Sequence, residues 1–136
     1  MKTAKELMLN YLKNVSDADK VSELFADDAV IELPYLASVG LPYRWEGKEV
    51  IRKFFQNLPD TFSGFHFINI QIHIDTPNQA FGEYGVEAMV KATGKPYNQH
   101  YMGRLQAENG KIKLLREAMN MVPVIKGMFP NTLPEL

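Results

Sequence analysis

The sequence contains no cysteine. This absence excludes disulfide bonds, thiolate nucleophiles and cysteine-ligated metal sites, and it fits a reducing compartment. No segment approaches the roughly 18 consecutive apolar residues that a membrane span needs, and residues 1–14 lack the unbroken apolar core of a signal peptide. We therefore expect a cytoplasmic protein without a membrane partner.

An excess of charge of one sign is also lacking. The chain has 15 Lys+Arg against 16 Asp+Glu, a net charge of -1, and nucleic acid binding needs a basic surface excess. There is no Gly-rich phosphate loop, dinucleotide fingerprint or Ser-His-Asp pattern. His66 and His73 have no third ligand at suitable spacing. We expect no nucleic acid partner, no metal and no cofactor.

The first half of the sequence has a helical pattern. Apolar residues recur at three- and four-residue spacing over residues 7–15, over 17–25 after a cap at Ser16 or Asp17, and over 47–58 until Pro59, which predicts three amphipathic helices. A short strand is predicted at residues 29–33, and Pro34 should end it. With 136 residues, the chain is expected to form a single domain over residues 1–136.

After Phe65 the pattern changes to alternation, which predicts long antiparallel strands. The strands run over residues 65–75, 80–92, 97–108 and 111–122, and Asn109-Gly110 predicts a tight hairpin between the last two. The alternation places one set of side chains on the outer face: Phe67, Asn69, Gln71, His73, Glu83 and Glu87. This mixed face is suited to packing against another sheet, so we expect a homodimer through it.

Together these elements predict an α+β fold in which a curved sheet wraps around three helices and leaves a pocket at one end. Between the first strand and the third helix, residues 34–46 combine turn formers with large apolar side chains. Such loops usually cover a core or a ligand. We expect four side chains of this loop to roof the cavity: Tyr35, Leu36, Tyr43 and Trp45.

Three segments, residues 23–30, 46–51 and 109–117, resemble the SnoaL-like branch of the NTF2-like superfamily. The last third, through Tyr97, His100 and residues 109–120, is similar to the phenazine-biosynthesis A/B proteins, followed by an extended, Pro-containing tail. The resemblance implies a cone-shaped, cystatin-like α+β fold, usually dimeric. Family members include isomerases, cyclases, hydrolases, dehydratases and non-catalytic proteins, so the fold alone does not select a function.

Glu117 is the first candidate for a catalytic residue. The alternation of Leu115, Glu117 and Met119 places this carboxyl group on the face expected to line the cone, where loss of solvation would raise its pKa toward neutrality. The resemblance implies the same role, because the matching glutamate of the phenazine proteins is implicated in acid/base catalysis. The alternative is a salt bridge on the outer face, which would also force Leu115 and Met119 outward.

His100 is the second catalytic candidate, because an imidazole titrates near neutral pH. Its strand does not show which face lines the pocket: Asn98, Met102 and Arg104 share the face of His100, and Tyr97 and Tyr101 share the other. A structural, hydrogen-bonded histidine is the alternative interpretation.

Two further positions can be compared with the ketosteroid isomerases, which resemble this chain in fold. Tyr11 resembles their hydrogen-bonding tyrosine, whereas Leu33 stands where they carry a catalytic aspartate, which argues against steroid isomerisation. The remaining prediction is a SnoaL-like enzyme that performs condensation, cyclisation or isomerisation by cofactor-independent acid/base chemistry on a small apolar cyclic or carbonyl-containing ligand. The alternative is a non-catalytic small-molecule-binding or interaction module. The predicted ligand-binding residues are Tyr11, Leu33, Tyr43, Trp45, Phe54, Tyr84, Tyr101, Leu115 and Met119.

Overall fold

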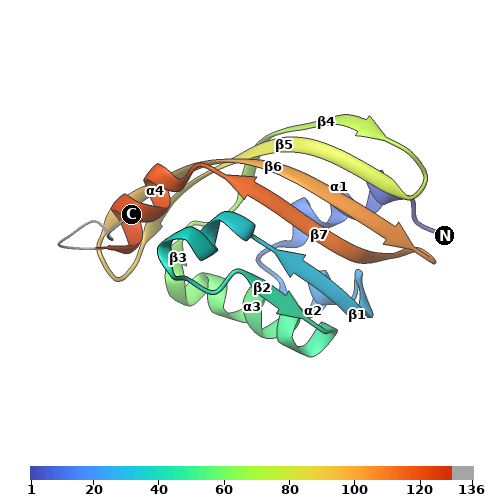
Figure 1. Cartoon of the computed structure of the whole chain (residues 1–136), viewed down its shortest axis with the longest axis horizontal. Helices are drawn as coiled ribbons and strands as arrows, with labels where there is room; N and C mark the ends of the chain where they lie inside the picture. Colours follow the sequence, from blue (N-terminus) through green and yellow to red (C-terminus); the bar gives the residue numbers. More distant parts are fainter. Residues whose placement is uncertain (130–136) are drawn as a thin grey trace.

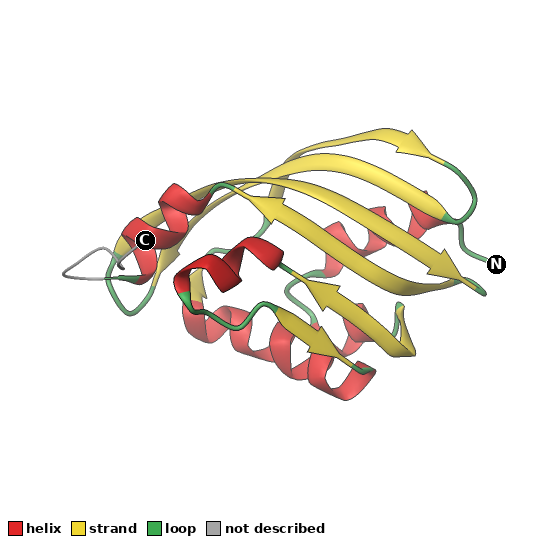
Figure 2. Ribbon diagram, in the orientation of Figure 1, coloured by secondary structure: helices red, strands yellow, loops and turns green. Residues whose placement is uncertain are grey.

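The computed structural model describes residues 1–129. A seven-stranded sheet curls around the helices (Figures 1 and 2), with the strand order β2-β1-β7-β6-β5-β3 and with β4 paired to β5 outside this path. The strands are β1 Phe25–Glu32, β2 Arg44–Glu46, β3 Phe62–Ser63, β4 Phe67–Asp75, β5 Gln79–Val90, β6 Lys95–Glu108 and β7 Lys111–Met119. The helices are α1 Ala4–Asn14, α2 Ala18–Ser22, the 3-10 helix η1 Pro34–Val39, α3 Lys48–Thr61 and α4 Met121–Met128. The predicted α+β architecture is confirmed.

The three early helices begin and pack much as their sequences predict. Thr3 caps α1 by accepting a hydrogen bond from the N–H of Glu6, and Asp17 caps α2 in the same way. The apolar face of α1 is buried against the sheet. The prediction that helix α3 ends at Pro59 is wrong. The helix continues to Thr61, and the N–H of Phe62 still donates a hydrogen bond to the carbonyl of Leu58.

Strand β4 differs from simple alternation because its pairing with β5 shifts register twice. At the first shift Asn69 adopts a left-handed φ of 54°, and the pairing moves from Ile68↔Gly85 to Gln71↔Glu83, so that β4 has one extra residue there; the second shift lies between Ile72 and Ile74. The extra residue at Asn69 puts Phe67 on the opposite face from Gln71 and His73. The prediction that Phe67 lies on the outer face is therefore wrong: its ring packs inside, 5.5 Å from the ring of Tyr11.

Strand β1 brings the first half of the chain beside the second. It begins at Phe25, earlier than predicted, and pairs in parallel with β7, including Ile31↔Leu115. The other strand pairs of this sheet are antiparallel. This connection places the loop that follows β1 next to the strand that carries Glu117.

The end of β7 also differs from the prediction. The strand stops at Met119 instead of Val122, and the chain turns into α4, which Asn120 caps, where an extended tail was expected. Val124 of α4 is buried, and Thr93 holds the end of the helix through a 2.7 Å hydrogen bond from its hydroxyl to the carbonyl of Gly127. The rest of the predicted tail, residues 130–136, lies outside the described residues. No helix within residues 1–129 is long and apolar enough to cross a membrane.

Candidate active site

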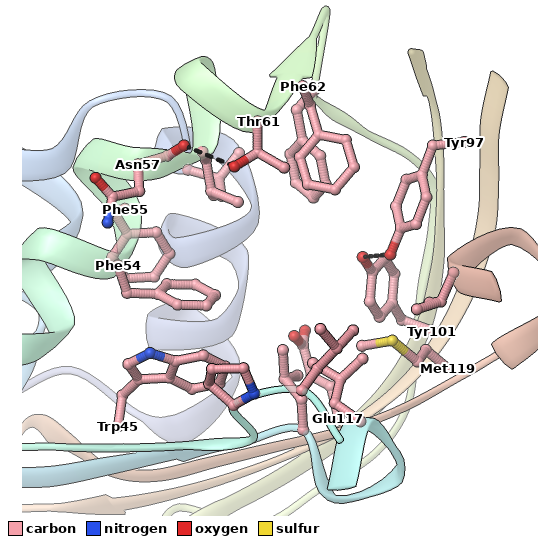
Figure 3. Close-up of a pocket in the computed structure, with 18 of the residues that line it drawn as sticks. Trp45, Phe54, Phe55, Asn57, Thr61, Phe62, Tyr97, Tyr101, Glu117 and Met119 are labelled. Atoms are coloured by element: carbon pink, nitrogen blue, oxygen red, sulfur yellow. Dashed lines mark hydrogen bonds between the residues drawn. The ribbon is translucent and has the colours of Figure 1, made fainter. Parts of the chain in front are cut away.

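A cavity of about 330 Å³ lies between the helices and the inner face of the sheet (Figure 3). Most of its walls are apolar, and α4 and the segment around η1 contribute to its rim. The lining residues are Tyr11, Val15, Leu33, Leu36, Leu41, Pro42, Trp45, Phe54, Phe55, Asn57, Leu58, Thr61, Phe62, Phe65, Phe67, Tyr97, Tyr101, Glu117, Met119, Val124 and Met128.

Aromatic rings pack against one another around this cavity. Trp45 of β2 lies 4.5 Å from the ring of Phe54 on α3, and Phe67 lies edge-on to Tyr101 at 5.9 Å. Figure 3 shows Trp45 and Phe54 on one side of the cavity and Tyr101 on the other. Tilted and edge-to-face contacts of this kind stabilise the ring arrangement, and the aromatic walls suit a small apolar or cyclic ligand.

Glu117 is the carboxylic acid on the wall of this apolar cavity. It lies on the inner face of β7 and is only 5% exposed. The hydroxyl of Tyr11 donates a 2.9 Å hydrogen bond to Oε2, and the hydroxyl of Tyr84 donates a second, short hydrogen bond to the same oxygen. Within residues 1–129, no hydrogen bond reaches Oε1. One carboxyl oxygen is thus fixed by two phenols, while the other has no hydrogen-bond partner among the described residues.

The surroundings of Glu117 bring its proton equilibrium to neutral pH. Burial raises the pKa of Glu117 from 4.5 to about 7, and the hydrogen bonds from Tyr84 and Tyr11 partly oppose this shift. Burial, together with the charge of Glu117, raises the pKa of both tyrosines well above the ordinary value. The two phenols therefore remain protonated donors, while Glu117 can accept or release a proton at physiological pH.

Tyr84 lies behind the cavity wall and not on it, contrary to the prediction. Its side chain is fully buried and is absent from the cavity lining. Its hydroxyl passes close to Gly103 of β6 to meet Glu117, and Gly103 is the residue paired with Glu117 of β7. A β-carbon at position 103 would overlap the Tyr84 hydroxyl and come within 2.9 Å of its Cζ. Gly103 therefore leaves the space that lets Tyr84 hold Glu117.

A second polar group on the wall is a pair of tyrosines from β6. The hydroxyls of Tyr97 and Tyr101 lie 3.0 Å apart, and Gln99 donates a 3.2 Å hydrogen bond to the hydroxyl of Tyr97. The Gln99 side chain also bridges to the backbone of Asn120 at 2.8 Å and 2.9 Å. This arrangement shows which face of β6 lines the cavity, a question that the sequence left open.

The same arrangement corrects the prediction for His100. Adjacent residues of a strand point to opposite faces, so the inward position of Tyr101 puts His100 on the outer face, where its side chain is 56% exposed. Its Nε2 lies 2.8 Å from Oε1 of Glu83, and Nε2 of His73 lies 2.9 Å from Oε2 of the same residue. These contacts lower the pKa of Glu83, with the hydrogen bond from His100 as the largest cause. His100 does not reach the cavity.

Two other predicted ligand-binding residues do not line the cavity either. Tyr43 is 44% exposed, because the chain entering β2 turns its side chain to solvent while its carbonyl accepts a 2.8 Å hydrogen bond from the N–H of Leu33. Leu115 is fully buried in the core next to β1. Of the four predicted roof residues, Leu36 and Trp45 line the cavity, whereas Tyr35 is exposed.

Six predicted ligand-binding residues do meet on the cavity wall together with Glu117: Tyr11, Leu33, Trp45, Phe54, Tyr101 and Met119. Sequence reasoning missed several aromatic lining residues, among them Phe62, Phe65, Phe67 and Tyr97. The sequence showed that Tyr97 shares a face with Tyr101 but not that this face is inward, and the inward position of Phe67 depended on the bulge at Asn69. Within the described part of the chain, no group of three or more His, Cys, Asp or Glu side chains is arranged to hold a metal ion.

Comparison with known proteins agrees with this architecture. Residues 10–115 match the SnoaL-like domain. The chain is 31% identical over 115 residues to the uncharacterised protein YesE of Bacillus subtilis, a match that covers 83% of this chain and 76% of YesE. A solved Bacillus subtilis structure, of a protein provisionally named an isomerase, has a TM-score of 0.82 at 25% identity and covers 96% of this chain and 95% of its own.

A phenazine biosynthesis-related protein from Pseudomonas aeruginosa has a TM-score of 0.79 at 21% identity, covering 98% of this chain and 88% of its own. At this identity the likeness shows the fold. It confirms the cone-shaped, NTF2-like fold that the sequence predicted and agrees with the expected similarity to the phenazine proteins. Because the domain match spans most of the chain, this protein is a member of the SnoaL-like family.

Proposed function

We propose that the protein is an enzyme that performs acid/base chemistry without a cofactor on a small, largely apolar ligand that carries a ring or a carbonyl group. The observation that carries this proposal is the position of the Glu117 carboxyl group. It is buried on the wall of an apolar cavity, its Oε2 is held by two phenols, and its Oε1 accepts no hydrogen bond from residues 1–129.

The chemistry that follows from this arrangement is proton transfer at carbon. Ionised Glu117 removes a proton from the carbon next to a carbonyl group, and the electron pair of that C–H bond moves to the carbonyl oxygen to give an enolate. A hydroxyl of the Tyr97–Tyr101 pair, on the same cavity wall, is available to donate to that oxygen. Return of the proton to another carbon completes an isomerisation. In a condensation or cyclisation the enolate carbon instead attacks a second carbonyl, whose π electrons move to its oxygen, and this alkoxide takes the proton back from Glu117.

A non-catalytic ligand-binding module is the second candidate. The observation in its favour is Leu33, which lines the cavity at the position where the similar ketosteroid isomerases carry their catalytic aspartate. In such a module, Glu117 would serve only as a hydrogen-bonding group for the bound ligand. The two candidates differ in whether the protein transfers protons to and from the ligand.

Solvent deuterium exchange separates the two functions. A panel of cyclic and aryl ketones in D₂O, followed by proton NMR, should lose signal at the carbon next to the carbonyl group in the presence of the protein. Glu117→Gln should slow this exchange by about 10²- to 10⁴-fold, while Glu87→Gln, on the exposed face of β5, should leave it unchanged. Ketones that bind without any exchange above background would contradict the enzyme proposal and support the binding module.

We also propose that the protein is a homodimer through the outer face of the sheet. This face includes the paired side chains of His73, Glu83 and His100, and the side chains of Met89 and Met102, which are 48% and 46% exposed. Sedimentation at micromolar concentration should give about twice the 15.5 kDa mass of the chain. Met102→Glu should shift the population toward monomer, and a wild-type monomer would contradict this assignment.

A further inference from the structure

We propose that the cavity selects uncharged ligands and rejects the corresponding carboxylates, and that Glu117 is the residue that makes this selection. The inference rests on the proposed ligand site and narrows its substrate class to neutral carbonyl compounds. It concerns binding, so it does not depend on whether the protein also turns the ligand over.

The described part of the cavity wall has no cationic side chain with which an anionic ligand could pair. Within residues 1–129, no Lys, Arg or His side chain lines the cavity, and Glu117 is the acid on its wall. Residues 130–136, with the sequence PNTLPEL, add no basic side chain. Transfer of a carboxylate from water into such a site is costly unless a cation or several hydrogen-bond donors replace its solvation.

Few hydrogen-bond donors on the cavity wall near Glu117 are free to bind a ligand. The phenols of Tyr11 and Tyr84 both donate to Glu117, and the amide of Gln99 is used by Tyr97 and Asn120. The Tyr97–Tyr101 pair shares one of its two hydroxyl protons, and this leaves one for a ligand on the wall beside Glu117. The Trp45 indole N–H and the Asn57 amide also line the cavity, on the side across from Tyr101 (Figure 3). One donor beside Glu117 suits a ketone oxygen, whereas a carboxylate in a dry site needs more.

Glu117 itself would repel an anionic ligand. A carboxylate bound in this cavity would lie close to a second carboxyl group, and like charges at such separations disfavour each other's ionised form. The anion could therefore bind only with Glu117 protonated. Because burial holds the pKa of Glu117 near 7, this condition is met at pH 6 and lost at pH 8, while an ordinary carboxylic acid with a pKa of about 4.3 stays ionised at both.

Matched ligand pairs test this selection without knowledge of the natural substrate. Cyclohexyl methyl ketone and cyclohexanecarboxylate share a ring and a carbonyl group and differ in charge, and acetophenone and benzoate form a second pair. Calorimetry with the wild-type protein at pH 8 should show the ketone of each pair bound at least about tenfold more tightly than its carboxylate. Between pH 8 and pH 6 the carboxylate affinity should rise, while the ketone affinity should change little.

The variant Glu117→Gln removes the charge and nearly keeps the shape, so it should bind the carboxylates more tightly than the wild-type protein at pH 8 and lose the pH dependence. The pH series on the wild-type protein tests the same selection without relying on the variant. Carboxylates that bind as tightly as ketones at pH 8 would overturn the inference and leave the proposed acid/base function standing. A clear preference for ketones without deuterium exchange would uphold the selection and contradict the acid/base function. Failure of both the ketones and the carboxylates to bind would overturn both proposals.

Discussion

Replacement of Glu117 by glutamine should change how the stability of the protein depends on pH. The pKa of Glu117 is about 7 in the folded protein and has its ordinary value of 4.5 when solvated. Between these values the unfolded chain has released the proton while the folded protein retains it. The free energy of unfolding of the wild-type protein therefore falls as pH rises through this window.

The size of the effect follows from the two pKa values. Each pH unit within the window changes the free energy of unfolding by about 1.4 kcal/mol. Across the interval from 4.5 to about 7 the free energy of unfolding therefore falls by about 3 kcal/mol. Because Glu117 is only 5% exposed, solvent screening does not reduce this estimate appreciably. Glutamine does not ionise, so the variant should lose this contribution.

Urea denaturation at pH 5, 6, 7 and 8 measures the difference directly. The free energy of unfolding of Glu117→Gln minus that of the wild-type protein should rise by about 2 to 3 kcal/mol from pH 5 to pH 8. Glu87→Gln, on the outer face, is the matched control and should follow the wild-type curve. A constant difference between Glu117→Gln and wild type at all four pH values would refute the argument that Glu117 is buried and protonated near neutrality.

Three further predictions concern the groups around Glu117. Tyr84→Phe removes one donor to Oε2 of Glu117 and should raise the pKa of Glu117, measured by carboxyl NMR, by about 1 to 2. The control Tyr97→Phe should leave this pKa unchanged, and a lower pKa in Tyr84→Phe would contradict the role of this hydrogen bond. Gly103→Ala should destabilise the protein by about 1–3 kcal/mol in urea because its methyl group meets Tyr84. The cost should be smaller in the Tyr84→Phe background, which lacks the hydroxyl and keeps the ring; equal costs would show that the Tyr84 hydroxyl is not what the methyl group meets. Trp45 is the only tryptophan in the chain and lines the cavity, so a bound ketone should change its fluorescence. Leu33→Phe, which takes up part of the cavity without adding a tryptophan, should weaken both the change and ketone binding; an unchanged signal at saturating ketone would place the ligand elsewhere.

The sequence predicted Glu117 because strand alternation is a local rule and β7 follows it from Leu115 to Met119, beyond the register shift near Ile112. Glu117 and Met119 share a face, and both line the cavity. Alternation also placed His100 and Tyr101 on opposite faces, but it did not decide which face is inside, since polar side chains lie on both: Gln99 beside the tyrosines, and Asn98 and Arg104 beside His100. That choice depends on the partners of Tyr97 and Tyr101 across the cavity, which are distant in sequence.

The incorrect predictions arose where backbone geometry broke a local rule. The bulge at Asn69 moved Phe67 of β4 inside, although asparagine is among the residues that tolerate positive φ. Gly103 gave no signal in the pattern of its strand, because its role is to make room for a phenol from the neighbouring strand β5. The helix α4 was missed because a proline-containing segment favoured an extended tail, whereas Asn120 supplies a cap and Val124 a buried contact.

The most direct test of the account is the titration of the Glu117 carboxyl group itself. Carbon-detected NMR of protein labelled at the glutamate side chain, with Glu117→Gln to assign the signal, gives its pKa in the folded state. The account predicts a value of about 7. A value near 4.3, as in a solvated glutamate, would mean that the carboxyl group is not buried at the cavity wall and would contradict its assignment as the acid/base group.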